Sequence, residues 1–412
     1  MADPSRHLFE AFGVELEYMI VDAETLSVRP IADRLIYEVA GRYVSEIELG
    51  DVAWSNELAQ HVVELKTNGP VGSLESLSAR FQDHVARVNH LLRPMNARLL
   101  PTAMHPWMDP HAELRLWPHE QGPIYEAFNR IFDCRGHGWA NLQSVHLNLP
   151  FADDAEFGRL HAAIRLLMPI MPALAASSPV VDRKVTGILD NRMRVYQGNA
   201  RRVPSVAAAV VPEPVFTRAD YEEQILRRIY RDIAPLDPEG VLQHEWLNAR
   251  GAIARFDRNT IEVRVLDVQE CPQADLAICA AIVAVLRAMT DQRWTSTAEQ
   301  QAMATGPLAA LLNAVVRDAE DTVIDDAGYL AHFGSSKAPS TARELWQHLI
   351  DELIPASSPW KTPLETILSA GTLARRILCA LAGDLDGRLL PVYRRLADRL
   401  AEGRLFVGDP LD

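Results

Sequence analysis

The chain has 412 residues, 48% of them hydrophobic and 23% charged, and a net charge of −14. This composition is typical of a soluble globular protein with a sizeable core, folded as one large domain or as two to three ordinary ones. The acidic balance and the lack of a long basic run argue against nucleic acid as the main partner. An acidic protein that handles an anionic substrate must supply local cations, so metal ions or focused arginines are expected at its site.

Cysteine use and the apolar stretches favour a reducing compartment. The four cysteines form no C-x-x-C pair and no dense framework, which argues against structural zinc and a disulfide scaffold. No apolar run of signal length occurs near the amino end. The most apolar stretches, 167–181 and 276–289, are too short or too rich in proline to span a bilayer. We therefore expect a cytoplasmic protein without membrane contact.

Strand-like runs concentrate in the first 150 residues. The stretch 13–22, "GVELEYMIVD", alternates apolar and acidic residues, and 61–67 ends at the turn signal "NGP". Alternation also marks 141–150 and 260–269, and 97–106 begins as a short buried strand before a proline-rich loop. The predicted helices are 73–100, 155–176, 274–291, 307–320, 340–354, 363–383 and 388–402.

The order of these elements predicts the architecture. Strands first and helices last favour an α+β fold, with helices on one face of a mainly antiparallel sheet and a cleft on the other. We expect residues 8–290 to form the core and 291–412 a helical segment packed on it, together one domain. The segment either supports the sheet or forms an oligomer contact, and core packing is favoured. The stretches 292–306 and 355–363 are predicted to be loops.

Four strand-like segments share one design, an aliphatic face opposite a face that carries Glu, His, Asn or Arg. In the first, Val14, Leu16 and Tyr18 lie on one side and Glu15 and Glu17 on the other. The other three are "NELAQHVVELKT", "SVHLNL" and "IEVRVL". Summed over the segments, the polar face offers Glu15, Glu17, Glu64, His146 and Glu262, with Glu57 seven residues before Glu64.

So many acids on one face suggest a metal site. Converging carboxylates repel one another, and several would stay protonated unless divalent ions balanced them. Oxygen-rich sites with one imidazole suit Mg²⁺ or Mn²⁺. Each piece also has an ordinary explanation: E-x-E is most often a solvated sheet face, a lone His146 a hydrogen-bonded histidine, and E-V-R a cross-strand ion pair. Their joint occurrence on four segments favours the metal site.

Arginines near these segments are candidates for anion binding, because the guanidinium group matches carboxylate and phosphate oxygens as a bidentate, permanently charged partner. For Arg192, Arg250 and Arg264 a functional and a structural role are both open, and Arg194 is expected at the surface.

In these motifs taken together, the chain resembles glutamate–cysteine ligase family 2, carboxylate–amine ligases related to glutamine synthetase. The matching stretches, in the family's order over residues 13–270, are "GVELEY", "NELAQHVVELKT", "SVHLNLP", "ALAASSPV", "TGILDNR" and "IEVRVLDVQ". The resemblance implies a glutamine-synthetase-like sheet with a metal-lined cleft, ATP, and Mg²⁺ or Mn²⁺. The metal ligands it implies are Glu15, Glu17, Glu57, Glu64, His146 and Glu262. It also implies that Arg192, Arg250 and Arg264 contact phosphate and the substrate carboxylate.

Two departures from the family pattern concern the substrates. Many relatives show H-x-H where this chain has His146-Leu147-Asn148. Asn148 is a poor ligand for a divalent ion. We therefore expect Asn148, like Ser144 on the same face, to contact substrate or ATP. The segment after Arg192, "RVYQGNARRVPSVAAAVVPEP", also differs from the commoner form, as does Asp190. These changes leave the amine in particular open.

The predicted function is an ATP-dependent carboxylate–amine ligase that forms an amide bond through an acyl phosphate. Glutamate and cysteine are the family's name-bearing pair. Arg264 and Arg192 are expected to balance charge at the transferring group, and no G-x-x-x-x-G-K-[ST] loop is present. The alternatives are a metal-dependent amide hydrolase, a thiol enzyme built on Cys134 and His137, and a non-catalytic relative that binds a nucleotide or amino acid. Instead of a thiol site, the stretch "HGW" (137–139) and the nearby 109–120 are expected to form a loop that shapes the mouth of the cleft.

Overall fold

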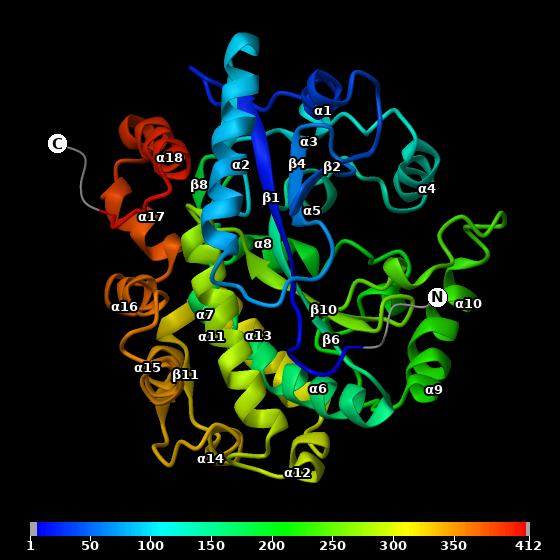
Figure 1. Ribbon diagram of the computed structural model, residues 1–412, viewed down its shortest axis with the longest axis vertical. Helices are drawn as coiled ribbons and strands as arrows, with labels where there is room; N and C mark the ends of the chain where they lie inside the picture. The colour runs from blue at the N-terminus through cyan, green and yellow to red at the C-terminus, as the bar shows by residue number, and fades with distance from the viewer. Residues whose placement is uncertain (1–5, 409–412) are drawn as a thin grey trace.

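An eight-stranded antiparallel sheet forms the centre of the molecule in the computed structural model, which describes residues 6–408 (Figure 1). Seven strands follow the order β2-β3-β4-β1-β6-β10-β9, and β5 pairs with the end of β1. The strands are β1 (Gly13–Asp22), β2 (Glu46–Leu49), β3 (Val52–Asn56), β4 (Val62–Thr67), β5 (Ala97–Leu100), β6 (Ser144–Pro150), β9 (Ala252–Arg255) and β10 (Thr260–Asp267). The expected α+β fold with a mainly antiparallel sheet is confirmed.

Strand β1 runs through the middle of the sheet and separates its two faces. Val14, Leu16 and Tyr18 are fully buried in the main hydrophobic core, as the alternation predicts. Beyond Tyr18 both faces are covered, because Met19 and Val21 pack in a second cluster with the carboxyl-terminal helices. An open polar face is therefore left only along the first half of β1, where the two glutamates lie.

Three long helices cover the aliphatic face: α2 (Leu77–Leu92), α6 (Asp154–Leu167) and α11 (Pro272–Thr290). In Figure 1, α2 and α11 cross in front of the sheet. Among the described residues, α11 is the helix long and apolar enough to cross a membrane, but 78% of its most apolar window is buried inside the protein. Such burial is that of a core helix.

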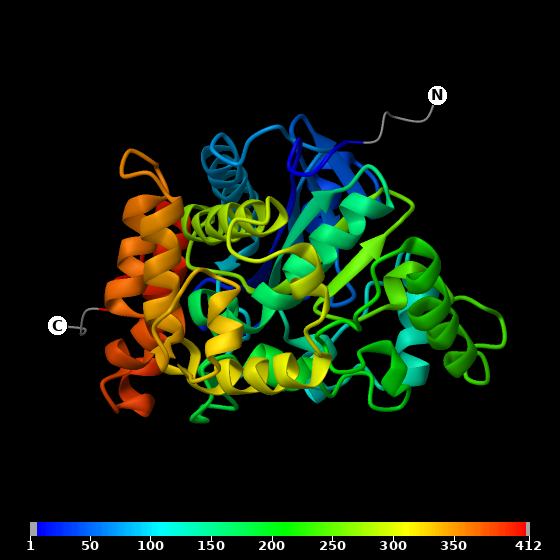
Figure 2. The same ribbon diagram turned by 90° about the horizontal axis from the view of Figure 1, so that it is seen from below.

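The helices from residue 342 on, orange and red in Figure 2, pack along one side of the sheet layer. Helices α15 (Ala342–Leu353) and α16 (Lys361–Ala370) contact α11, and α18 (Leu385–Glu402) contacts β5 and α2. An ion pair between Arg376 and Glu270, both fully buried, joins this part to the core. The division at residue 290 stays a prediction.

The remaining elements are short helices and small strands around the sheet. The α-helices are α1 (Ala32–Ala40), α3 (Pro110–Glu113), α4 (Gly122–Phe132), α5 (His137–Ala140), α7 (Pro172–Ala175), α8 (Asn191–Tyr196), α9 (Arg218–Tyr221), α10 (Arg227–Ile233), α12 (Thr297–Gln301), α13 (Thr305–Asp318), α14 (Ala327–Ala331) and α17 (Leu373–Leu381). The 3₁₀ turns are η1 (Arg93–Met95), η2 (Met168–Ile170), η3 (Pro204–Val206), η5 (Glu245–Leu247) and η6 (Ala319–Asp321), and η4 (Glu222–Leu226) is a π-helical turn. The small strands are β7 (Val180–Val181), β8 (Lys184–Val185), β11 (Val323–Ile324) and β12 (Ser340–Thr341).

Several predicted boundaries differ for local reasons. The helix expected over 155–176 is divided at Pro169 and Pro172, since proline cannot continue the hydrogen-bond ladder. The helix expected over 363–383 is divided at Gly371, whose φ of 91° lies outside the helical region. The stretch 292–306 contains α12, which begins with a capping box at Ser296 and Glu299.

Candidate functional site

Strand register brings the predicted acids together on the four central strands. Glu17 on β1 lies opposite Glu64 on β4. Glu15 lies opposite His146 on β6, and Glu262 on β10 lies opposite Asn148 on β6. Because the strands are adjacent, these side chains project from neighbouring positions of one sheet face.

A cavity of about 490 Å³ lies over this face. The predicted residues that line it are Glu15, Glu17, Glu57, Glu64, Ser144, His146, Arg192, Glu262 and Arg264. The opposite wall comes from α4, α5, the end of α8 and η5. The sequence therefore identified most residues on the sheet side of the cavity and few on the opposite wall, which we call the cover.

Two groups of ligand atoms share His146. Glu15, His146 and Glu262 form one group, and Glu17, Glu64 and His146 form the other, with the ligand atoms of each group within 4.8 Å of one another. The Nδ1 atom of His146 lies 2.9 Å from Glu15 and 3.8 Å from Glu262, and its Nε2 atom lies 3.8 Å from Glu17. Glu57 lines the same cavity but belongs to neither group.

Residues of β6 orient the acids. The backbone N–H and the hydroxyl of Ser144 donate to the carboxylate of Glu17 at 2.7 and 3.0 Å. The amide of Asn148 donates to Glu15 at 3.1 Å. Asn148 itself does not line the cavity. The structure thus places Asn148 behind Glu15.

Protein cations balance part of the acidic charge. Lys66 Nζ lies 3.3 Å from Glu64 and 2.6 Å from Glu46. Arg264 Nε lies 2.6 Å from Glu262. The spacing could have revealed Lys66, because residues two apart on a strand share a face and Lys66 follows Glu64 by two. The acids therefore face one another with counter-charge from Lys66 and Arg264 beside them.

Burial and mutual repulsion still perturb the carboxylates. Burial, with the charges of Glu17, Glu64 and Glu15, raises the pKa of Glu57 well above its usual value. Burial and the charge of Glu15 raise the pKa of Glu64 to about 7 although Lys66 opposes the shift. Burial also acts to raise the pKa of Glu15, but the hydrogen bond to His146 prevails and lowers it to about 2. A set of carboxylate oxygens with one imidazole and unrelieved repulsion fits a site for Mg²⁺ or Mn²⁺.

Arg192 lies at the edge of the cavity with its guanidinium held from behind. Its Nη2 donates to the Arg264 carbonyl at 2.7 Å, and its Nη1 lies 3.6 Å from Asp267. Asp267 is anchored in turn by the hydroxyl of Ser178 at 2.9 Å. The Nε of Arg192 has no hydrogen-bond partner among the described residues. Arg192 is thus held by protein groups at the cavity lining, and its unpaired Nε is buried.

Arg250 does not join this site. Its guanidinium is fully buried and forms a bidentate pair with Glu213 at 2.6 and 2.7 Å, and it also donates to Asn248 at 3.0 Å. It is not among the residues that line the cavity. Its partner Glu213 lies 37 residues away in the sequence, so the motif around Arg250 does not reveal this pair.

The proposed thiol site is not formed either. Cys134 is buried, and burial raises the pKa of its thiol to about 12, which disfavours the reactive thiolate. His137 pairs instead with Asp182 at 3.1 Å.

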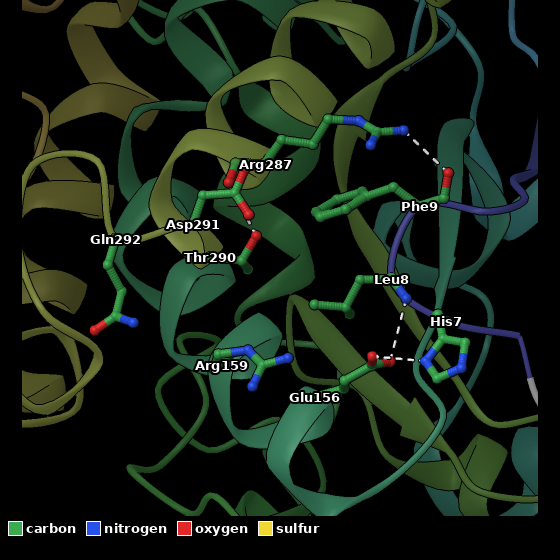
Figure 3. A pocket seen from close by; sticks show the side chains of 9 residues that line it. All are labelled: His7, Leu8, Phe9, Glu156, Arg159, Arg287, Thr290, Asp291 and Gln292. Atoms are coloured by element: carbon green, nitrogen blue, oxygen red, sulfur yellow. Dashed lines mark hydrogen bonds and ion pairs between the residues drawn. The ribbon is translucent and has the colours of Figure 1, made fainter.

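A second hollow, of about 370 Å³, lies beside α6 and α11 (Figure 3). In it His7 Nδ1 lies 2.9 Å from Glu156, and Arg287 donates to the Phe9 carbonyl at 3.0 Å while its guanidinium lies over the Phe9 ring. None of the predicted site residues lines it. These contacts fasten residues 7–9 to the helical layer, and we assign them a structural role.

Comparison with known proteins agrees with the motifs. The model of glutamate–cysteine ligase family 2 matches residues 11–336, which confirms the resemblance. An "Uncharacterized protein" of Archaeoglobus fulgidus is 37% identical over 281 residues, 68% of this chain and 75% of that protein. A protein of Corynebacterium glutamicum named "Putative glutamate--cysteine ligase 2" is 25% identical over 278 residues, 66% of this chain and 64% of that protein.

Solved structures show the same fold at low sequence identity. Glutamate–cysteine ligase from Francisella tularensis in complex with AMP has a TM-score of 0.59 and 13% identity, covering 96% of this chain and 90% of that one. A bifunctional glutathione synthetase from Pasteurella multocida has a TM-score of 0.57 and 14% identity, covering 96% of this chain and 52% of that one. The chain thus spans about half of the bifunctional protein.

Proposed function

The chain belongs to glutamate–cysteine ligase family 2, and we propose that it is an ATP-dependent carboxylate–amine ligase. The observation that carries this proposal is the pair of acidic groups that share His146 beside Arg192 and Arg264 in one cavity. The related glutamate–cysteine ligase that binds AMP supports ATP as the nucleotide. Small-molecule acid and amine substrates and a cytoplasmic location are parts of the same proposal.

Amide formation in water is uphill, and ATP makes it feasible through an acyl phosphate. A carboxylate oxygen of the acid attacks the γ-phosphorus, and ADP leaves with the electron pair of the broken P–O bond. The amine nitrogen then attacks the acyl carbon, phosphate leaves, and the nitrogen loses a proton. Positioning and charge neutralisation supply most of the catalysis in such transfers.

The side chains divide this work by their charge. Mg²⁺ or Mn²⁺ held by Glu15, Glu17, Glu64, His146 and Glu262, with Glu57 beside them, would neutralise the phosphate oxygens. Arg264 and Arg192, which both line the cavity, would hold the transferring group or the acid's carboxylate. Ser144 and Asn148 keep Glu17 and Glu15 oriented by their hydrogen bonds. Ser144 also lines the cavity and can contact the substrate, whereas Asn148 lies behind Glu15.

The test is ADP release by purified protein with ATP, Mg²⁺ and a panel of amino acids. ADP should form only when a matching acid and amine are both present, whereas an amide hydrolase would turn over without nucleotide. Glu15→Gln and Glu262→Gln should abolish ADP release and keep the wild-type circular dichroism spectrum. Glu24→Gln, an exposed acid outside the cavity, is the matched control. Full activity in both site variants would refute the proposal.

A further inference from the structure

The cavity has two chemically different halves. The sheet side carries charged and polar side chains. The side formed by the cover is aromatic: Tyr125 and Phe128 from α4, Trp139 from α5 and Trp246 from η5 line it. Leu142 and Leu247 lie in the same lining. Neither α4, α5 nor η5 places a charged side chain in the cavity.

The aromatic side chains form one continuous surface. The ring centroid of Phe128 lies 5.2 Å from that of Trp139 and 5.8 Å from that of Trp246. All three side chains are only partly buried by the protein. When an apolar ligand covers rings that are partly exposed inside a cavity, the burial of their apolar surface favours binding.

This surface begins directly at the acidic cluster. The hydroxyl of Tyr125 accepts a hydrogen bond from Asn56 at 3.0 Å, and Asn56 precedes Glu57. Burial, followed by the charge of Glu57, raises the pKa of Tyr125. A group bound along the rings would therefore lie next to the place where the acyl phosphate forms, which is where the amine has to enter.

Charge places the triphosphate of the nucleotide in a different part of the cavity. A triphosphate follows cations, and Arg255 and Arg258 line the cavity from the β9–β10 hairpin. Arg255 Nη1 lies 3.6 Å from Glu262, so these cations continue the charged half outward from the cluster. The neutral aromatic half is left for a substrate without a charged side chain.

The cover is fixed to the segment that departs from the family pattern. Asn199 donates a hydrogen bond to the carbonyl of Gly138, and Tyr196 and Asn199 line the cavity. A Cβ atom on Gly138 would overlap the side chain of Asn199, so this contact requires glycine at 138. The departing segment therefore helps to place Trp139, the neighbour of Gly138, on the wall.

We propose that the amine substrate carries an aromatic or branched aliphatic side chain that packs against Phe128, Trp139 and Trp246. The inference rests on the proposed ligase function and names the amine class for that site. A side chain as small as that of alanine or cysteine would leave most of the aromatic surface uncovered. Burial of a phenylalanine or leucine side chain here corresponds to a preference of about tenfold to a hundredfold over alanine.

The experiment measures binding and turnover separately. Amino acid amides are used as amines, because without a carboxylate they cannot act as the acid. Calorimetric titrations with phenylalaninamide, leucinamide, cysteinamide and alaninamide are run on the full chain with Mg²⁺ and a non-hydrolysable ATP analogue. ADP release is then measured with ATP, the same amides and the panel of amino acids as acids.

We expect phenylalaninamide and leucinamide to bind at least tenfold more tightly than alaninamide and cysteinamide. Phe128→Ala should reduce that ratio to less than threefold, while affinity for the ATP analogue stays within twofold of wild type. Trp246→Ala, on a different element, should have the same effect and covers the case in which Phe128→Ala does not fold. Tyr37→Ala, at an exposed aromatic residue of α1 outside the cavity lining, should keep the ratio.

The outcomes separate this inference from the function it rests on. Selective binding that is lost in Phe128→Ala, without ADP release from any pair, would support the amine pocket and refute the ligase. ADP release without selectivity among the amides, or with a preference for cysteinamide, would overturn the inference and leave the ligase standing. Equal loss of affinity for the ATP analogue and phenylalaninamide in Phe128→Ala would assign the rings to the adenine base, and would overturn it as well. Absence of binding by every amide would also overturn it.

Discussion

Replacement of Glu64 by glutamine should stabilise the metal-free protein while it weakens nucleotide binding. Glu64 is buried opposite Glu17, and its pKa is raised to about 7. Glutamine keeps an oxygen that can accept the hydrogen bond from the hydroxyl of Ser55 and removes the carboxylate charge. The variant therefore tests whether the acidic cluster is under net repulsion.

The magnitude follows from the shift of the Glu64 pKa. A rise from 4.5 to about 7 means that the folded state binds more protons than the unfolded state between these values. The free energy of unfolding consequently falls as pH rises through this window, and above it the charged form costs about 3 kcal/mol. Glu64→Gln should recover about 3 kcal/mol at pH 8 and almost nothing near pH 4.

The assay is urea unfolding in EDTA at pH 8 and pH 4, followed by the thermal shift with ATP and Mg²⁺. The variant should have the higher urea midpoint at pH 8, and the ligands should stabilise it less than wild type. Glu46→Gln is the control, because it removes the other, half-exposed partner of Lys66 and should cost less than about 1 kcal/mol. Destabilisation by Glu64→Gln at pH 8 would refute the reasoning, since attraction to Lys66 would then outweigh the repulsion.

Three further predictions concern groups outside the cavity. Burial and the charge of Arg165 lower the pKa of His161 to about 3. The unfolded state therefore binds a proton first, and the free energy of unfolding should fall as pH falls below about 6.5. For His161→Gln, the free energy of unfolding should depend less on pH between 6 and 4. Arg376→Ala leaves the carboxylate of Glu270 buried without its partner, which should reduce the free energy of unfolding by about 3–5 kcal/mol. Urea denaturation measures this loss, and a loss below about 1 kcal/mol would contradict the role of the ion pair. Iodoacetamide at pH 7.5 should modify the exposed thiol of Cys379 and spare the buried cysteines in the folded protein, as peptide mass spectrometry can show.

The face of each strand could be predicted from the sequence because alternation is a local property. In β1, the burial of Val14 and Leu16 places Glu15 and Glu17 on the other side whatever the strand pairs with. The pairing of Glu17 with Glu64 needs the register of two strands whose residues lie 47 positions apart. The family motifs indicate that these two residues are neighbours, whereas the alternation within a single strand does not.

The cover of the cavity has a weaker signal: the stretch "HGW" (137–139) is predicted only as a loop at the mouth of the cleft, and its Trp139 does line the cavity. Phe128 and Trp139 lie on short helices whose apolar residues look like ordinary core positions, and only the folded chain leaves their rings at the cavity. Arg250 shows the reverse case, because the sequence leaves a functional role open and Glu213 holds it in a buried ion pair. Long-range partners decide both outcomes, and such partners leave no pattern in the surrounding residues.

The central claim is that the shared acidic cluster binds divalent ions that hold the triphosphate. Mn²⁺ binding followed by electron paramagnetic resonance, with and without ATP, tests it most directly on wild type and on His146→Asn, since His146 belongs to both groups. We predict that wild-type protein binds Mn²⁺ and that ATP tightens this binding, whereas His146→Asn loses most of it while folded. Equal Mn²⁺ affinity in the two proteins, or no binding by wild type with ATP present, would contradict the account.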